Sequence, residues 1–212
     1  MTVAGGLFIV FEGGDGVGKS TQVDLLVSWL GELGHRAVRT HEPGGSPLGP
    51  DIRRLLLSTA GHPPSPRAEA LLYAAERAEH VASVVRPALA RGDVVVCDRY
   101  VDSSVAYQGV GRGLGAEHIR EISIWATDGL RPDLTVLLDL GPTPALSRST
   151  DPADRLESEP MDFHERVREA FLTFAGSDPD RYLVLDASRE RHDLHEQVRT
   201  SVGALLAERS PR

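Results

Sequence analysis

Lysine is nearly missing from this chain: Lys19 is the only one, and all other permanently cationic side chains are arginines. Asparagine is absent, and Cys97 is the only cysteine. One cysteine excludes an internal disulfide and cannot form a zinc site. Because Cys97 lies in an apolar run, we expect it to be a small, buried hydrophobic residue.

No apolar run reaches the ~20 residues of a membrane-spanning helix, and the first residues lack the basic start of a secretory signal. We therefore expect a soluble, cytoplasmic protein. Its net charge of −8 argues against a general nucleic-acid-binding function, so any basic site must be local. A length of 212 residues suits one α/β domain, which we assign to residues 1–212.

The most informative stretch is a glycine-rich loop between an apolar run, residues 7–11, and a segment with helical periodicity. Gly13 and the Gly18–Lys19–Ser20 triplet have the G-x-x-x-x-G-K-[ST] spacing of a phosphate-binding loop. We expect the loop to bind a nucleoside triphosphate through Gly13, Gly14, Asp15, Gly16, Val17, Gly18, Lys19, Ser20 and Thr21.

The chemistry of phosphate binding explains this spacing. Glycines let backbone N–H groups turn toward phosphate oxygens, and the following helix directs the positive end of its dipole at the same anion. Lys19 adds a point charge for the outer phosphates, and Ser20 offers a hydroxyl to Mg²⁺. The alternative is a glycine-rich turn with a chance lysine, which a chain without any other lysine disfavours.

Strands and helices are predicted to alternate along the chain. Strands are expected at 7–11, 37–40, 94–97, 134–138 and 182–185. Helices are expected at 19–33, 51–58, 67–91, 116–127, 162–175 and 189–207, with a polar, glycine-rich connection up to Gly115. This order predicts a three-layer α/β fold of the P-loop NTPase type, with a central parallel sheet of about five strands covered by helices on both faces.

Asp98 and Arg99 directly follow the apolar strand 94–97. Ligands of parallel sheets bind beyond the carboxyl ends of the strands, so we expect this pair to lie near the phosphate loop. There the carboxylate suits Mg²⁺, and the guanidinium fork can span two phosphates. The alternative is an Asp–Arg pair that caps the strand at the surface.

Two weaker patterns leave their alternatives open. Tyr73 and Arg77 lie four residues apart, so a helix places the ring and the guanidinium group on one face. A site for a nucleoside monophosphate would need such a pair. An amphipathic helix with a surface arginine is the more ordinary interpretation. The charged segment 145–160 lacks apolar periodicity. It is either a lid that brings an arginine over the triphosphate or a solvated connection.

Taken together, seven segments resemble the thymidylate kinase family. They are FEGGDGVGKST at 11–21, EPGG at 42–45, LYAAER at 72–77, DRY at 98–100, SSVAYQG at 103–109, PD at 132–133 and DRLE at 154–157. The resemblance covers nearly the whole chain in the right order. It implies transfer of the γ-phosphoryl group of ATP to dTMP, giving dTDP and ADP for dTTP synthesis, with Mg²⁺ as cofactor.

The resemblance also implies the site residues. Catalytic roles fall to Asp15, Lys19, Asp98, Arg99 and Arg148. Metal contacts fall to Ser20, Asp98 and Glu157. Substrate contacts fall to Glu42, Pro43, Arg53, Tyr73, Arg77, Arg99, Ser103, Ser104, Tyr107, Gln108 and Asp154.

Within the substrate set, the resemblance implies that Arg53 and Arg77 hold the dTMP phosphate and that Tyr73 stacks on thymine. Ser104 and Gln108 would bind the edge of the base. In the same way, Pro43 would pack near the thymine methyl group. Tyr107 would lie against the sugar and disfavour a 2′-hydroxyl.

The chain departs from the family pattern at three points. His41 stands where an arginine is usual, and Tyr73 where a phenylalanine is usual. The segment 145–160 is shorter and poorer in arginine than in many bacterial relatives. Because the phosphate loop carries no arginine, the catalytic cation would come from this segment, as Arg148 or Arg155.

The same residues bear on other possible functions. A GTPase switch would need an Asn-Lys-x-Asp motif, which a chain without asparagine cannot supply. Another nucleoside monophosphate kinase or deoxynucleoside kinase remains open on fold alone. A non-catalytic nucleotide-binding protein would not need arginines around a second site. The resemblance further implies a homodimer through the long helices, although apolar residues such as Leu71 and Val81 could equally be core.

Overall fold

Five strands pair in parallel, in the order β2-β3-β1-β4-β5. They are β1 (Leu7–Glu12), β2 (Ala37–His41), β3 (Val94–Asp98), β4 (Leu134–Asp139) and β5 (Tyr182–Asp186). The computed structural model describes residues 5–59, 62–147 and 153–209. Within these ranges, the predicted parallel sheet of five strands is confirmed.

The helices of the described residues include the six that the sequence predicts, in that order, and two short ones, at 101–104 and 142–146, that it does not predict. They are α1 (Lys19–Glu32), α2 (Gly49–Leu57), α3 (Pro66–His80), α4 (Arg86–Ala90), α5 (Val101–Ser104), α6 (Ala116–Thr127), α7 (Pro142–Leu146), α8 (Met161–Ser177) and α9 (Arg191–Arg209). A π-helical turn, η1 (Val81–Val85), joins α3 to α4. The three segments follow one another without a break and correspond to the long helix predicted at 67–91. A short 3₁₀ turn, η3 (Pro179–Arg181), precedes β5.

One prediction about secondary structure is wrong. The segment up to Gly115 was expected to be a polar connection, but α5 and a second π-helical turn, η2 (Val105–Gly111), occupy most of it. Val105, Ala106 and Tyr107 are buried there. Their burial against the rest of the protein outweighs the low helix propensity of the local sequence.

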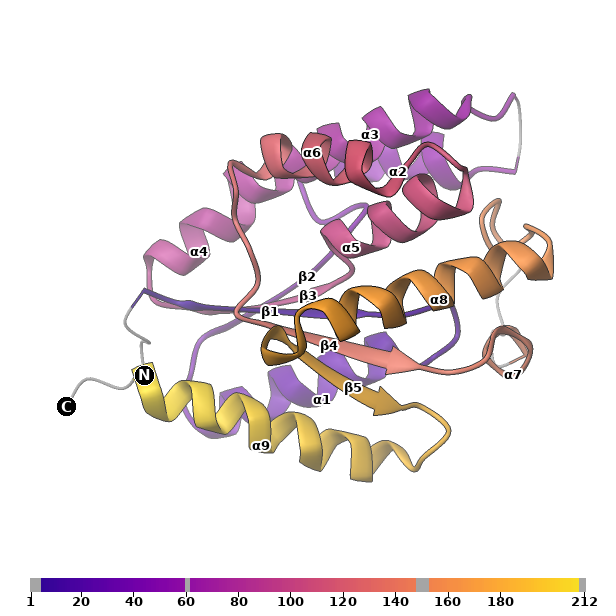
Figure 1. Cartoon of the computed structure of the whole chain (residues 1–212). Helices are drawn as coiled ribbons and strands as arrows, with labels where there is room; N and C mark the ends of the chain where they lie inside the picture. Colours follow the sequence, from indigo (N-terminus) through magenta and orange to yellow (C-terminus); the bar gives the residue numbers. More distant parts are fainter. Residues whose placement is uncertain (1–4, 60–61, 148–152, 210–212) are drawn as a thin grey trace.

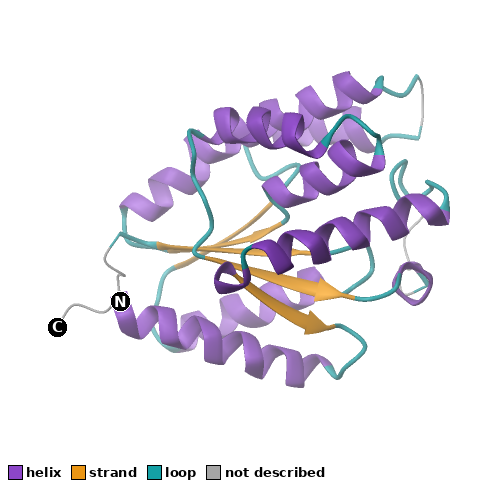
Figure 2. Cartoon of the chain, in the orientation of Figure 1, coloured by secondary structure: helices purple, strands orange, loops and turns teal. Residues whose placement is uncertain are grey.

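The helices form a layer on each face of the sheet. α1 and α9 cover one face, while α3, α6 and α8 lie over the other (Figures 1 and 2). Side chains of a strand point alternately to its two faces. Ile9 accordingly packs in the cluster that contains Leu26 and Val198, whereas Phe8 packs with Val85. None of the helices in the described ranges is long and apolar enough to cross a membrane.

The topology brings the predicted site residues to one edge. β1 lies in the centre of the sheet, between β3 and β4, and the phosphate loop leaves from its carboxyl end. Asp98 ends the neighbouring strand β3 and lies in register with Phe11. Because all strands are parallel, the loops after β1, β2 and β3 meet at the same edge of the sheet.

Candidate active site

The phosphate loop depends on two glycines for its shape. Gly13 has φ 131° and Gly16 has φ 74°, in the region that favours glycine. A Cβ atom on Gly13 would lie 2.4 Å from the carbonyl oxygen of Leu138, and one on Gly16 would lie 2.0 Å from that of Ala145. Both distances are far too short, so the loop can pack against β4 and α7 only with glycine at these positions.

Lys19 begins α1 and folds back over the loop. Its ammonium group donates to the carbonyl oxygens of Gly13 (3.2 Å) and Gly14 (2.5 Å), and it is almost fully buried. Burial, followed by the nearby charge of Arg99, lowers the pKa of Lys19 to about 8. An anion that binds here would raise this pKa again, so the site is electrostatically suited to a phosphate.

A hydroxyl and a carboxylate meet beside the loop. Ser20 Oγ donates to Asp98 Oδ2 at 3.0 Å, which joins the start of α1 to the end of β3. Both residues line the same hollow as Lys19. Oxygen ligands of this kind are the ones that Mg²⁺ prefers.

Arg99 is held in place from several sides. Its backbone has φ 69°, unusual for a residue with a side chain, and its N–H donates to the carbonyl of Phe11 at 2.9 Å. The guanidinium donates to Gly13 O at 2.8 Å and to Asp15 Oδ1 at 2.5 Å. Tyr107 Oη donates to the other oxygen of Asp15 at 2.8 Å.

These contacts keep Asp15 ionised. Burial alone would raise the pKa of Asp15, but the charges of Arg99 and Lys19 and the hydrogen bonds of the site lower it to about 2. A carboxylate and two cations therefore lie together at the mouth of the loop.

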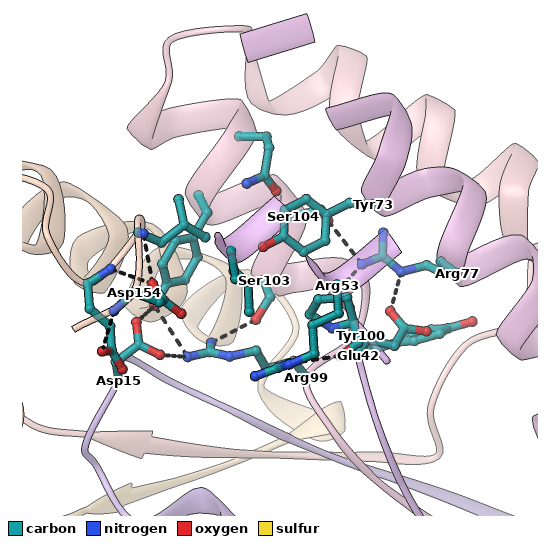
Figure 3. A pocket seen from close by; sticks show the side chains of 16 residues that line it. Asp15, Glu42, Arg53, Tyr73, Arg77, Arg99, Tyr100, Ser103, Ser104 and Asp154 are labelled. Carbon is teal, nitrogen blue, oxygen red and sulfur yellow. Dashed lines mark hydrogen bonds and ion pairs between the residues drawn. The ribbon is translucent and has the colours of Figure 1, made fainter. Parts of the chain in front are cut away.

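A pocket opens beside the loop, and every predicted substrate contact lines it. We call it the acceptor pocket. Its lining residues are Asp15, Glu42, Pro43, Arg53, Leu57, Tyr73, Arg77, Arg99, Tyr100, Ser103, Ser104, Tyr107, Gln108, Asp154, Leu156 and Glu157. Figure 3 shows that Asp15 and Asp154 lie at one side of this pocket, and Arg77 with Glu42 at the other.

A second hollow lies over the phosphate loop itself, and we call it the loop pocket. Its lining residues are Asp15, Gly16, Gly18, Lys19, Ser20, Thr21, Arg39, His41, Glu42, Arg53, Asp98, Arg99 and Glu157. The predicted metal contacts Ser20, Asp98 and Glu157 are all among them. Five residues line both pockets: Asp15, Glu42, Arg53, Arg99 and Glu157. The two pockets therefore meet at Arg53 and Arg99.

Arg77 lines the acceptor pocket but not the loop pocket, and it is only 1% exposed. Its Nε donates to Glu42 Oε2 at 2.7 Å, and Nη2 donates to the carbonyl of Tyr100 (3.1 Å) and to Ser104 Oγ (3.0 Å). Nη1 donates to Ser123 Oγ at 3.3 Å. Its charge is thus already neutralised within the protein, unlike the charge of Arg53, which among the described residues donates only to the Pro43 carbonyl.

Glu42 has a second buried partner that the sequence did not indicate. His80 Nδ1 lies 2.8 Å from Glu42 Oε1, and its Nε2 lies 2.6 Å from Thr40 Oγ1. Burial would raise the pKa of Glu42, but Arg77 and His80 together lower it. The ionised Glu42 therefore fixes the direction in which Arg77 enters the pocket.

The charged segment 145–160 contributes to the site in an unexpected way. Asp154, Leu156 and Glu157 line the acceptor pocket. Arg155, one of the two predicted catalytic cations, instead turns away: it forms an ion pair with Glu69 (2.6 Å) and lines neither pocket. Arg148, the other candidate, lies outside the described residues.

Sequence reasoning also missed Glu12, the last residue of β1. It is fully buried and accepts hydrogen bonds from the backbone N–H of Tyr100 (2.9 Å) and from Ser103 Oγ (2.6 Å). Burial, followed by the charge of Asp102, raises the pKa of Glu12 to about 7. The sequence does offer a signal for this residue, because Glu12 is an acidic residue at the end of an apolar strand, directly before the phosphate loop.

The chain is similar to known proteins over most of its length. The profile of a family described as thymidylate kinase matches residues 11–198. The chain is 60% identical over 205 residues to a protein named thymidylate kinase from Clavibacter michiganensis subsp. michiganensis, covering 95% of this chain and 97% of that protein.

Two further relatives carry the same name. The one from Leifsonia xyli subsp. xyli is 58% identical over 197 residues, covering 92% of this chain and 93% of that protein. The one from Cutibacterium acnes is 52% identical over 202 residues, covering 95% and 98%. These matches extend well beyond the phosphate loop, over the elements that line both pockets.

Proposed function

Because this chain belongs to the thymidylate kinase family, we propose that it transfers the γ-phosphoryl group of ATP to dTMP. The products are dTDP and ADP, on the route to dTTP. The observation that carries this proposal is the meeting of two pockets at Arg53 and Arg99. A kinase for a monophosphate needs such a junction, since donor and acceptor phosphates must approach each other there.

Phosphoryl transfer asks little covalent work of the protein. The enzyme aligns the two phosphates and cancels their negative charge. ATP would occupy the loop pocket, with Lys19 against its outer phosphates. Arg99, held by Asp15 and by the carbonyl of Gly13, would bridge donor and acceptor.

The charges of the acceptor pocket orient dTMP within it. Arg53 and Arg99 lie at the junction and would bind the acceptor phosphate. Arg77 is already paired with Glu42, and four of its five N–H groups have acceptors. One remaining donor suits a base carbonyl better than a phosphate dianion, so we reassign Arg77 from the phosphate to the thymine end of the pocket.

The remaining lining residues support this orientation. Tyr73 lies near Ser104 and Arg77 (Figure 3), where its ring would stack on the base. Tyr107 donates to Asp15 and so lies closer to the junction, which supports a role for its ring beside the sugar. We therefore propose that Tyr73 stacks on thymine and that Tyr107 lies against the sugar.

Magnesium fits the loop pocket through Ser20 and Asp98. Among the described residues, no group of three or more acidic, histidine or cysteine side chains can hold a metal. Phosphate and water oxygens would have to complete its shell, as is usual for Mg²⁺ in nucleotide sites. When bound, the metal neutralises charge on the donor phosphates. Glu157 lines both pockets and would be a further carboxylate contact for the metal.

We further propose that one domain, residues 1–212, acts as a homodimer. α3 and α6 pack against each other and carry exposed apolar side chains, with Leu71 58% and Trp125 84% exposed. Val81 and Val85, on the continuation of the long helix, are buried core residues instead. Exposed apolar groups on paired helices are typical of an interface.

The test is an ADP-release assay with Mg·ATP and, in separate reactions, dTMP, dUMP, UMP, CMP, AMP and GMP. We expect strong preference for dTMP. Preference for another monophosphate would keep the kinase chemistry and overturn the proposed base site. If no monophosphate accepts a phosphoryl group while ATP still binds, the chain would be a non-catalytic nucleotide-binding protein.

A further inference from the structure

We infer that Glu69 is a positioning residue that acts on the acceptor pocket from behind, by fixing the amide of Gln108 and docking residues 153–160. Glu69 lies on α3, is 1% exposed and does not line the pocket. The inference rests on the proposed function, because it concerns how the pocket distinguishes pyrimidine bases.

Three side chains converge on the Glu69 carboxylate. Gln108 Nε2 donates to Oε1 at 2.8 Å. Arg112 donates through Nε and Nη2 to the two oxygens, each at 3.3 Å. Arg155 Nη2 lies 2.6 Å from Oε2. A buried charge is stabilised by such partners, and these come from two parts of the chain, residues 108–112 and Arg155.

The carboxylate determines which way the Gln108 amide points. An ionised carboxylate only accepts hydrogen bonds, so Gln108 must turn its NH₂ group toward Glu69. Its Oε1, to which no described residue donates, is then the atom left for a ligand in the acceptor pocket. A carbonyl at that position accepts from the N3–H of thymine, whereas N3 of cytosine is itself an acceptor and would be repelled.

The same carboxylate docks one wall of the pocket. Arg155 also donates through Nε to the carbonyl of Leu56 at 2.9 Å. Leu156, the next residue, is buried in the cluster that contains Tyr107. Arg112 extends the attachment, because its Nη1 donates to Glu159 at 2.6 Å.

This docking brings three wall residues to the acceptor pocket, namely Asp154, Leu156 and Glu157. Glu69 thereby links the docking of residues 153–160 to the orientation of the Gln108 amide. When residues 153–160 are docked, the Glu69 carboxylate is fully paired and the pocket wall is in place. The amide that reads the base is bound to that same carboxylate.

The substitution Glu69→Gln tests the amide directly. It replaces one acceptor oxygen with an NH₂ group that must itself find an acceptor. Arg112 and Arg155 have none to offer, so only Gln108 can respond, by turning its oxygen inward and presenting its NH₂ group to the pocket. We expect the ratio of kcat/KM for dTMP over dCMP to fall about tenfold or more.

Arg155→Gln separates the two effects. It weakens the docking of residues 153–160 but leaves the Glu69–Gln108 bond in place. We expect the KM for dTMP to rise while the preference over dCMP is kept. Glu117→Gln, which removes an exposed ion pair with Arg120 (3.1 Å), is the matched control and should change neither quantity.

Hydrogen exchange of the whole protein provides a readout that needs no substrate. The amides of Leu156 and Glu157 should exchange faster in both Glu69→Gln and Arg155→Gln than in the wild type or the control. Unchanged exchange would overturn the docking role. An unchanged base preference in folded Glu69→Gln would overturn the role in orienting Gln108.

The proposed function and this inference can be disproved independently of each other. If the wild type prefers a monophosphate other than dTMP, the function is wrong, and a shift of that preference in Glu69→Gln would still support the positioning role. A wild type that discriminates between no bases would overturn both.

Discussion

Arg77 donates to Glu42 at 2.7 Å, and both side chains are almost fully buried. An ion pair of this kind is costly to break, because the partner that remains is a buried charge without compensation. The pair therefore belongs to the folding of the protein as well as to its site. Arg53, which lines both pockets, forms no such pair among the described residues and is exposed.

Arg77→Ala should accordingly destabilise the protein. We expect the free energy of unfolding to fall by about 3–5 kcal/mol, measured by urea denaturation in the absence of nucleotides. Arg53→Ala is the contrasting variant, with a change within about 0.5 kcal/mol but a raised KM for dTMP. Equal stabilities of the two variants would contradict the assignment of Arg77 to a structural ion pair.

Arg99→Ala should act on turnover. Arg99 lies at the junction of the two pockets, where charge develops during transfer, and a well-placed arginine can contribute ~10³ or more to the rate. We expect kcat with saturating ATP and dTMP to fall by about that factor. Arg99→Lys keeps the charge but loses the bidentate fork, so it should recover only part of the loss. A kcat within a few fold of the wild type in Arg99→Ala would remove this residue from the mechanism.

The sequence predicted the centre of the sheet well because β1, β3 and β4 are buried on both faces. Val94 to Cys97 is an uninterrupted apolar run, which is typical of a central parallel strand. The strand still extends one residue further, to Asp98, because backbone pairing with Phe11 and His41 continues after the apolar signal has ended. Apolar periodicity indicates burial and not hydrogen bonding, so it does not predict a polar residue at the end of a strand.

The helical segment after Tyr100 was missed for a different reason. Its glycines suggested a loop, yet Gly109 and Gly111 serve close packing: a Cβ on Gly109 would lie 2.9 Å from Cα of Ala116, and one on Gly111 2.5 Å from the ring of Phe163. A glycine that fits a helix against a neighbour cannot be distinguished by sequence from one that breaks a helix.

For the site residues, too, the sequence predicted the positions better than the contacts of their side chains. Motif spacing led to the phosphate loop and, together with the family resemblance, to the predicted residues of the acceptor pocket, all of which line it. It could not place Arg155, whose direction is decided by an ion pair with Glu69, a residue far away in the chain. Nor could it separate Arg77 from Arg53, because the partner Glu42 becomes visible only in three dimensions.

Cys97 should be unreactive in the folded protein. It is fully buried on β3, and burial raises the pKa of its thiol well above the usual range, so almost no thiolate forms. We expect no reaction with Ellman's reagent under native conditions and one equivalent in denaturant. Fast labelling of the native protein, with unfolding ruled out by circular dichroism, would contradict the burial of this strand.

Trp125→Glu should dissociate the proposed homodimer. Trp125 is 84% exposed on α6, and a charge in a packed apolar interface is strongly unfavourable. We expect sedimentation velocity to show a dimer for the wild type and a monomer for this variant. Met161→Glu, at an exposed apolar residue on α8, is the control and should leave the wild-type sedimentation unchanged. A monomeric wild type would refute the dimer.

Glu12 should make stability depend on pH. Burial raises the pKa of Glu12 from 4.5 to about 7 in the folded protein, so between these values the folded state binds a proton that the unfolded state has lost. The free energy of unfolding should therefore fall as pH rises from about 4.5 to 7 and level off above it. A shift of this size corresponds to a contribution on the order of 3 kcal/mol.

Glu12→Gln isolates this contribution, because the amide keeps an acceptor for the N–H of Tyr100 but cannot ionise. Other titrating groups change stability equally in both proteins, so they cancel in the difference between them. Urea denaturation at pH 5 and pH 8 should show the wild type losing stability relative to Glu12→Gln as pH rises. If the two proteins keep a constant difference in stability, Glu12 is ionised throughout, and the charges of Arg99 and Lys19 compensate for its burial more completely than its surroundings indicate.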